Sequence, residues 1–132
     1  VVEEQRNNSN LIWDYIKDLN FISRRPAPHS SYETADALVL QLESSKLARL
    51  CKEELMKENV ATKILPEAIS WHFAGLWDHI DELKLKNNNL SKDLEPSFEK
   101  LSKCIALPIS TNFNDRFPIF IRKALISAHK NY

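Results

Sequence analysis

Two histidines and several carboxylates lie close together near the middle of the sequence. His72 and His79 are seven residues apart, and Asp78, Asp81 and Glu82 surround the second histidine. On a helix, this spacing separates the two imidazoles by about 10 Å along the axis, too far to bind one metal ion without ligands from elsewhere. Asp78 does not converge on His79, because consecutive helix positions point about 100° apart. We therefore predict no metal site and interpret the carboxylates as a solvated acidic face.

Motifs for nucleophilic catalysis and phosphate binding are absent from the sequence. The chain has one glycine, Gly75, in 132 residues. P-loops, dinucleotide-binding turns and nucleophile elbows each need several glycines close together. The serines fall at expected helix caps or in loops, and neither cysteine has a histidine nearby in the sequence. These observations predict no catalytic residue, no bound cofactor and a protein that is not an enzyme.

The two cysteines indicate the cellular compartment. Cys51 and Cys104 fall on apolar faces of expected helices and have no C-x-x-C or histidine-rich context, so a zinc site is not expected. We expect two reduced core thiols in an intracellular protein of the nucleus or cytoplasm. The alternative is one disulfide in a secreted protein, for which the N-x-S sequons at Asn7 and Asn89 provide some support.

The overall charge indicates no polyanionic partner. Lysine plus arginine and aspartate plus glutamate number 18 each, which gives a formal net charge of zero. Arg24 and Arg25, beside Phe21 and His29, form a small group that could contact phosphate, but no nucleic-acid-binding motif surrounds it. No apolar run is long enough for a membrane span. Because the first residue is valine, we expect residues 1–132 to be a single helical domain excised from a longer protein.

Apolar residues recur with helical spacing along most of the chain. The spacing predicts helices over residues 10–23, 66–86, 93–107 and 115–130. A capping box at Ser30–Glu33 predicts another helix, which would bury Ala35, Leu38, Val39 and Leu42. A second apolar set begins at Leu47, and we predict a break in the helix at residues 44–46. The predicted fold is all-α, a compact bundle of five or six antiparallel helices with no sheet.

Some large apolar side chains fall outside the expected core stripes. Trp71 and Leu85 point away from the apolar face of the 66–86 helix, and Trp13 lies at the edge of the apolar face of the first helix. An exposed tryptophan is a common anchor at binding surfaces. Alternatively, the 66–86 helix is central and covered on both sides, in which case Trp71 belongs to the core.

The last predicted helix has a second apolar stripe. Ile119 and Ile126 are seven residues apart and lie beside Arg122 and Lys123. Such a stripe could bind an acidic amphipathic helix or peptide from a partner protein. A solvated basic face with two isolated isoleucines is the alternative.

The sequence therefore predicts a non-catalytic protein–protein interaction or scaffold domain. Its partner would bind through exposed helix faces, with neither nucleic acid nor membrane involved, and the oligomeric state stays open. Two alternatives are a secreted four-helix, cytokine-like ligand with one disulfide and a helical nucleic-acid-binding domain. The predicted partner-binding residues are Trp71, Leu85, Ile119, Arg122, Lys123, Ile126 and Trp13.

Overall fold

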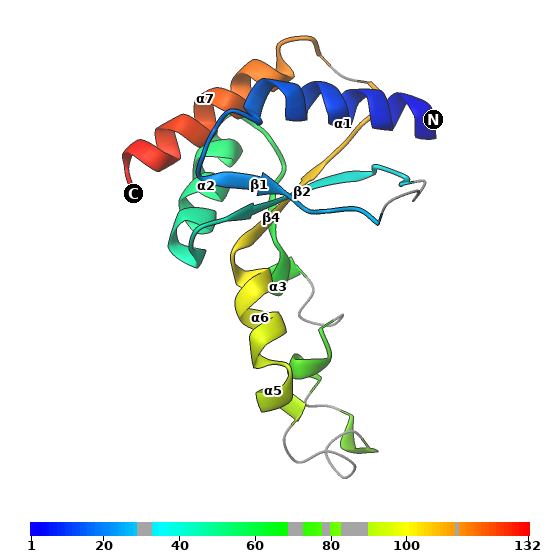
Figure 1. Cartoon of the computed structure of the whole chain (residues 1–132), viewed down its shortest axis with the longest axis vertical. Coiled ribbons are helices and arrows are strands. Elements are labelled where there is room, and N and C mark those ends of the chain that lie inside the picture. The colour runs from blue at the N-terminus through cyan, green and yellow to red at the C-terminus, as the bar shows by residue number, and fades with distance from the viewer. Residues whose placement is uncertain (29–32, 69–72, 78–79, 83–89, 113) are drawn as a thin grey trace.

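The chain folds into a sheet with helices packed on one of its faces. The computed structural model describes residues 1–28, 33–68, 73–77, 80–82, 90–112 and 114–132. In the described part, four antiparallel strands form a sheet in the order β1-β2-β4-β3. Helices α1, α2 and α7 pack together and cover one face (Figure 1). The strands are β1 (Ile22–Arg24), β2 (Ala37–Leu42), β3 (Lys63–Ile64) and β4 (Cys104–Pro108), and the three helices are α1 (Val2–Ile16), α2 (Ser45–Lys57) and α7 (Phe117–Lys130).

The prediction of an all-α bundle is therefore wrong. Its main error lies at β2, where the sequence was expected to continue a helix opened by a capping box. Leu38, Leu40 and Leu42 are buried while the residues between them are half-buried, which is the alternation of a strand. The same stretch also contains apolar residues three and four positions apart. A short apolar run is compatible with either a helix or a strand. Here the pairing of β2 with both β1 and β4 makes these residues a strand.

A second strand occupies the end of the helix predicted over residues 93–107. Helix α6 (Glu95–Ser102) ends early, and β4 follows from Cys104. The first four residues of β4 are all buried, which hides the two-residue period of a strand. No tight turn signals the sheet either, because residues 25–36 separate β1 from β2. This topology therefore needs none of the tight Asn-Gly or Asp-Gly turns that mark a hairpin in a sequence.

The break expected within a helix at residues 44–46 is not found, because the strand β2 precedes this point and α2 already begins at Ser45. Ser44 caps α2 by accepting a hydrogen bond from the Leu47 backbone amide at 3.1 Å. At its other end, α2 is followed by Asn59 in the left-handed conformation, with a φ of 59°. Helix α7 occupies nearly the range expected for the last helix.

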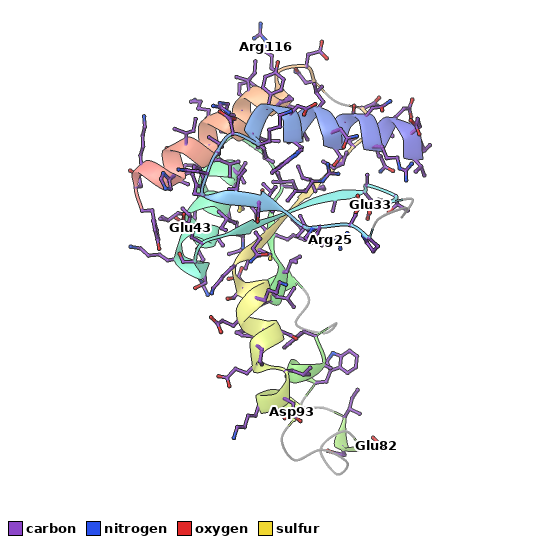
Figure 2. The ribbon with its side chains drawn as sticks, viewed as in Figure 1. Arg25, Glu33, Glu43, Glu82, Asp93 and Arg116 are labelled. Carbon is purple, nitrogen blue, oxygen red and sulfur yellow. The ribbon has the colours of Figure 1, made fainter. Side chains whose placement is uncertain are left out.

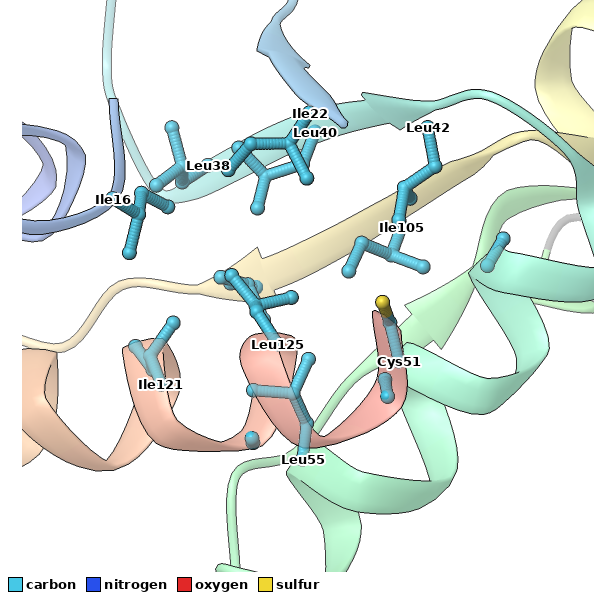
Figure 3. Close-up of a cluster of buried hydrophobic side chains, with 14 of the residues drawn as sticks. Ile16, Ile22, Leu38, Leu40, Leu42, Cys51, Leu55, Ile105, Ile121 and Leu125 are labelled. Carbon is cyan, nitrogen blue, oxygen red and sulfur yellow. The ribbon is translucent and has the colours of Figure 1, made fainter. Parts of the chain in front are cut away.

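The core lies between the sheet and the three helices. Figure 3 shows side chains of β2 and β4 facing those of α1, α2 and α7. Leu40 and Ile105 are opposite each other in the β2–β4 pair, and Ile64 of β3 is opposite Ile105 on its other side. All three side chains are buried. The middle of the sheet is thus fixed to the helical layer by the central strand β4.

A separate group of short helices extends away from the sheet. It comprises α3 (Leu65–Ala68), the 3-10 helix η1 (Ala74–Leu76), α5 (Leu90–Asp93) and α6 (Figure 1). The single helix predicted over residues 66–86 is therefore wrong, because α3 ends at Ala68 and η1 is a separate turn. Gly75 lies in η1, where an added Cβ would approach the Phe73 ring to 2.7 Å. Phe73 in turn contacts Phe98 of α6, with ring centroids 5.8 Å apart.

None of the helices described is long and apolar enough to cross a lipid bilayer. The expected nuclear or cytoplasmic location stays a prediction.

Candidate functional site

The second face of the sheet is left largely open by the helices. Val39 and Gln41 of β2 project from this face and are half-buried. Their partners in β4 are Ala106 and Cys104, respectively. Helices α1, α2 and α7 all pack on the other face; among the described helices, α3 and α6 approach the end of the sheet on this side.

A groove of about 440 Å³ lies where the open face meets α6. We call it the sheet groove. Apolar side chains from β2, α3 and α6 line much of it, including Val39, Leu65 and Leu101. Two cations, Arg25 and Lys100, also line it, and no carboxylate does so among the described residues. The described residues that line it are Arg25, Pro26, Val39, Gln41, Leu65, Ser97, Lys100, Leu101 and Cys104.

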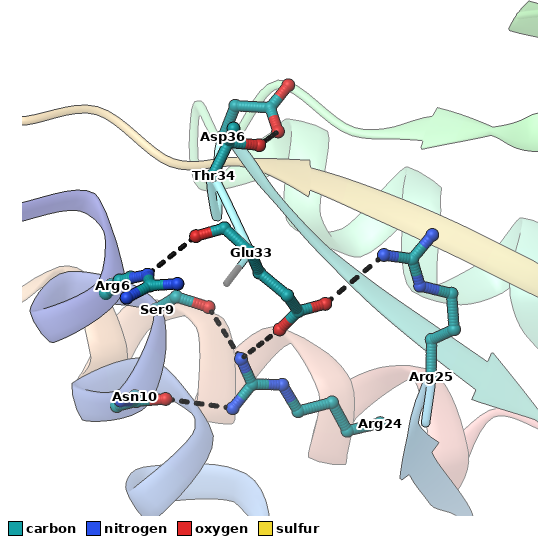
Figure 4. Close-up of polar contacts among 8 residues, drawn as sticks. All are labelled: Arg6, Ser9, Asn10, Arg24, Arg25, Glu33, Thr34 and Asp36. Carbon is teal, nitrogen blue, oxygen red and sulfur yellow. Dashed lines mark hydrogen bonds and ion pairs between the residues drawn. The ribbon is translucent and has the colours of Figure 1, made fainter. Parts of the chain in front are cut away.

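A network of polar side chains lies at the N-terminal end of β2 and shares Arg25 with the sheet groove (Figure 4). We call it the Glu33 cluster; its members are Arg6, Ser9, Asn10, Arg24, Arg25 and Glu33. The Glu33 backbone carbonyl accepts a hydrogen bond from Arg6 Nε at 2.6 Å. Arg24 donates to Asn10 Oδ1 at 3.0 Å and lies 3.8 Å from the Glu33 carboxylate. The cluster therefore ties α1 to the end of β1 and to the segment that enters β2.

Arg25 belongs to both features. Its backbone amide donates to the Val39 carbonyl at 3.0 Å, and its guanidinium lies 3.4 Å from Glu33 Oε1. Figure 2 shows Arg25 and Glu33 close together, with Glu43 at the opposite end of β2. Because the Arg25 side chain is largely exposed, this ion pair is weak, and the guanidinium can turn toward a ligand in the sheet groove at little cost.

The backbone beside Glu33 is strained. Ala35 is buried and has a φ of 55°, in the left-handed region that non-glycine residues seldom adopt. Such a conformation costs about 1–2 kcal/mol and persists only where surrounding contacts enforce it. At this position, the enforcing contacts include the hydrogen bond between Ile109 and Asp36, which joins the start of β2 to the end of β4.

The two thiols lie on opposite faces of the sheet. Cys51 is part of the core between sheet and helices, and burial raises its pKa to about 12. Cys104 lines the sheet groove, and burial raises its pKa too, partly opposed by the nearby Lys100 charge. Both are free thiols. The disulfide required by the cytokine-like alternative is therefore not formed, and neither thiol is activated as a nucleophile.

The structure brings together the four residues predicted on the last helix. Ile119, Arg122, Lys123 and Ile126 line a second groove of about 430 Å³ along α7. Both cations are paired, since Arg122 donates to Asp18 Oδ2 at 2.8 Å and Lys123 lies 2.9 Å from Glu58. These carboxylates reduce the positive charge offered to an acidic partner. Binding of a partner here stays a prediction.

The remaining predicted residues are dispersed. Trp13 is partly buried and packs against the core. Trp71, Leu85, His72, Asp78 and His79 lie outside the described residues. Phe21, named with Arg24 and Arg25 as a possible phosphate contact, is buried and stacks on His129 with ring centroids 4.1 Å apart. In the part of the chain that the structure describes, no group of three or more metal-binding side chains is found.

The Asp18–Arg122 pair provides a prediction that can be checked directly. The hydrogen bond from Arg122, aided by its positive charge, lowers the pKa of Asp18. We expect carbon-detected NMR to show an Asp18 pKa below its usual range in the protein and near that range in Arg122→Gln. A carboxyl with a lowered pKa contributes stability at neutral pH that is lost as the pH falls through that pKa. An unchanged Asp18 pKa in Arg122→Gln would show that the pair does not form in solution.

The residues of the sheet groove were mostly missed by sequence reasoning. They come from four separate segments, which only the fold brings together. The one available signal was the Arg24–Arg25 pair directly before Pro26, which the sequence marked as a possible phosphate contact. Lys100, Gln41 and Ser97 have no distinguishing context in the sequence.

The sequence matches no family model and no curated protein. The fold, however, matches several solved enzymes. The Helicobacter pylori aminotransferase PseC, involved in the biosynthesis of pseudoaminic acid, superposes with a TM-score of 0.70 at 11% identity, over 99% of this chain and 33% of its own. A sugar aminotransferase of Streptococcus pneumoniae in its PLP form gives 0.68 at 13%, over 99% and 32%. An E. coli GDP-4-keto-6-deoxy-D-mannose-3-dehydratase with bound hydrated PLP gives 0.60 at 14%, over 94% and 30%.

These similarities correct the functional prediction. The chain spans about a third of the length of each matched enzyme, and identities of 11–14% show the fold alone. The expected non-catalytic scaffold domain, and with it the prediction that the chain is not an enzyme, is contradicted because the fold occurs in sugar-modifying enzymes. The cytokine-like and helical nucleic-acid-binding alternatives required an all-helical fold and fail with it.

Proposed function

We propose that this chain forms one domain of a PLP-dependent enzyme that modifies a sugar, with amino-group transfer as its reaction. The observation that carries the proposal is the superposition of 99% of the chain on about a third of two sugar aminotransferases. In this proposal the remainder of the enzyme carries the cofactor. The domain would help to bind and enclose the substrate.

The described residues do not form a PLP site by themselves. PLP enzymes hold the cofactor through a lysine in a pocket, with an acidic or arginine partner for the pyridine nitrogen. The buried polar and charged residues among those described are Ser9 and Thr62, so no described lysine is buried. Lys100 of the sheet groove is exposed. We therefore assign no step of the cofactor chemistry to the described part of this chain.

The open face of the sheet is the surface best suited to face a substrate. Among the described residues it lacks a full helical layer, and it has a groove lined by apolar side chains and two cations, one of which, Arg25, is paired with Glu33 two residues before the strained Ala35. Strained residues and concave surfaces with a few polar groups are both typical of functional sites. The covered face, by contrast, is filled by the core.

The test uses the natural protein that carries this chain, purified in the presence of PLP. We expect bound PLP by visible absorbance. We also expect transfer of an amino group from glutamate to GDP-4-keto-6-deoxy-D-mannose, followed by mass spectrometry of the sugar product. If the same substrate loses water and gains no nitrogen, the result would favour a dehydratase reaction, as in the name of the E. coli enzyme. Failure to bind PLP would show that the proposal is wrong.

A further inference from the structure

We infer that the groove along α7 binds an acidic amphipathic helix of a partner protein, with Ile119 and Ile126 as its apolar contacts. We call this groove the α7 groove. The inference does not depend on the proposed function, because α7 belongs to the helical layer and the sheet groove lies on the other face of the sheet (Figure 1). The observations that carry it are the exposure, the spacing and the charge of side chains on the outer side of α7.

The outer side of α7 has apolar surface that the core does not use. Ile119 is 50% exposed, and Ile126 is half-buried. Both line the groove of about 430 Å³, together with Arg122, Lys123 and Lys130. A concave strip that is apolar in the middle and polar at its edges is typical of surfaces that bind an amphipathic helix. The buried residues of α7 lie on its other side and are Pro118, Ile121, Ala124, Leu125 and Ala128.

The spacing along α7 favours a helical partner. Ile119 and Ile126 are seven residues apart, and so are Lys123 and Lys130. Two helical turns separate the members of each pair by about 10 Å along the axis. Each lysine follows an isoleucine by four residues, so both lysines lie on the same side of the apolar row. Helices that pack along their length have this seven-residue repeat, with apolar residues at the seam and charged residues at its edge.

The charge at the edge of the α7 groove favours glutamate or aspartate on the partner. Three cations and no carboxylate line the groove among the described residues. Lys130 is exposed and forms no ion pair with a carboxylate in the described part of the chain. Lys123 is paired with Glu58, but its side chain is 70% exposed, so the pair is weak and the lysine can turn toward a partner at little cost. Arg122 is held by Asp18 and fixes the wall of the groove.

A second copy of the chain fits this surface less well than an acidic helix. If two copies paired through α7, each would bring the same three cations and no lining carboxylate, so like charges would meet. The carboxylates that neutralise Arg122 and Lys123 are already engaged within the chain. A partner helix with glutamates beside its apolar row meets Lys123 and Lys130 without such repulsion.

The experiment measures binding of a synthetic peptide to the natural protein that carries this chain, by fluorescence anisotropy of a label on the peptide. The probe is a helix of three heptads with leucine at the seam positions and glutamate at the edges, and the control peptide has lysine in place of each glutamate. We expect the glutamate peptide to bind and the lysine peptide not to bind. Ile119→Ser and Ile126→Ser should each weaken binding about tenfold, because each removes apolar surface that the leucines bury. Lys130→Glu should weaken the glutamate peptide and favour the lysine peptide.

The matched control is Met56→Ser. Met56 is a 56% exposed apolar residue on α2 and does not line the α7 groove, so its replacement should leave the affinity unchanged. The two isoleucine variants should retain the far-UV circular dichroism of the natural protein, because neither side chain is fully buried. Lys130 is exposed, so the charge-reversal result does not depend on the stability of the isoleucine variants.

Several results would overturn the inference. If the glutamate peptide does not bind, or binds Ile126→Ser as tightly as the natural protein, the α7 groove is not a helix-binding site. If the two peptides bind equally well, or Lys130→Glu leaves their preference unchanged, the partner is not acidic. If Ile126→Ser converts a dimer of the natural protein into monomers in analytical ultracentrifugation, a second copy occupies the groove.

Discussion

Replacement of Ile105 by alanine should destabilise the protein by roughly 2–5 kcal/mol, the range measured for truncation of fully buried large aliphatic side chains. Ile105 is 0% exposed and lies in the central strand β4, opposite Leu40 on one side and Ile64 on the other. The lost methylenes would leave a cavity between the sheet and the helices, because neighbours on two strands are fixed by the sheet and cannot collapse into it. Urea unfolding followed by circular dichroism measures the change.

The control for this prediction is Ile119→Ala. Ile119 is the same residue type but is 50% exposed on α7, so its truncation should change the free energy of unfolding by no more than about 0.5 kcal/mol. The pair of variants tests the burial of Ile105 and not the choice between strand and helix, because a helix over residues 93–107 could also bury this side chain. Equal effects of Ile105→Ala and Ile119→Ala would contradict the position of β4 at the centre of the sheet.

A long, regular apolar pattern predicted one helix correctly, α7, whose stripe follows from local chemistry. Equally regular patterns over residues 10–23 and 66–86 gave wrong helices, because α1 spans Val2–Ile16 and α3 ends at Ala68. The strands do not follow in this way. β3 has two residues, and β4 is too uniformly apolar to show a period. Their identity depends on pairing between segments far apart in the chain, as with Gln41 and Cys104.

The candidate site was less predictable than the fold, for a related physical reason. The sheet groove exists because β2 presents Val39 and Gln41 on the face opposite α1, α2 and α7, where among the described helices only α3 and α6 approach it. Helical spacing placed Val39 in the core, since positions 38, 39 and 42 share a helix face. Once the same residues form a strand, Val39 moves to the face opposite Leu38. Because a helical period was assigned to the residues of β2, the sequence predicted neither this strand nor the groove beside it.

Cys51 should make the protein lose stability as the pH rises above about 9. Its side chain is 0% exposed, and burial raises its pKa from 9.0 to about 12. The folded protein therefore retains a proton that the unfolded chain releases between these two values. Stability from this group is fully present below pH 9 and is lost as the pH approaches 12, with a slope of about 1.4 kcal/mol per pH unit. Urea unfolding at several pH values from 8 to 11, under argon, measures the slope.

The comparison that isolates this effect is Cys51→Ala. The variant has a cavity and is less stable at every pH, but it lacks the buried thiol, so its stability should fall less steeply above pH 9. Tyrosine and lysine residues titrate in both proteins, and their contribution cancels in the difference between the two curves. Parallel curves from pH 8 to 11 would mean that Cys51 titrates alike in the folded and unfolded chain. In that case α2 could not pack on the sheet as the structure has it, because a thiol sealed between Leu55 and Ile105 has no water to stabilise its anion.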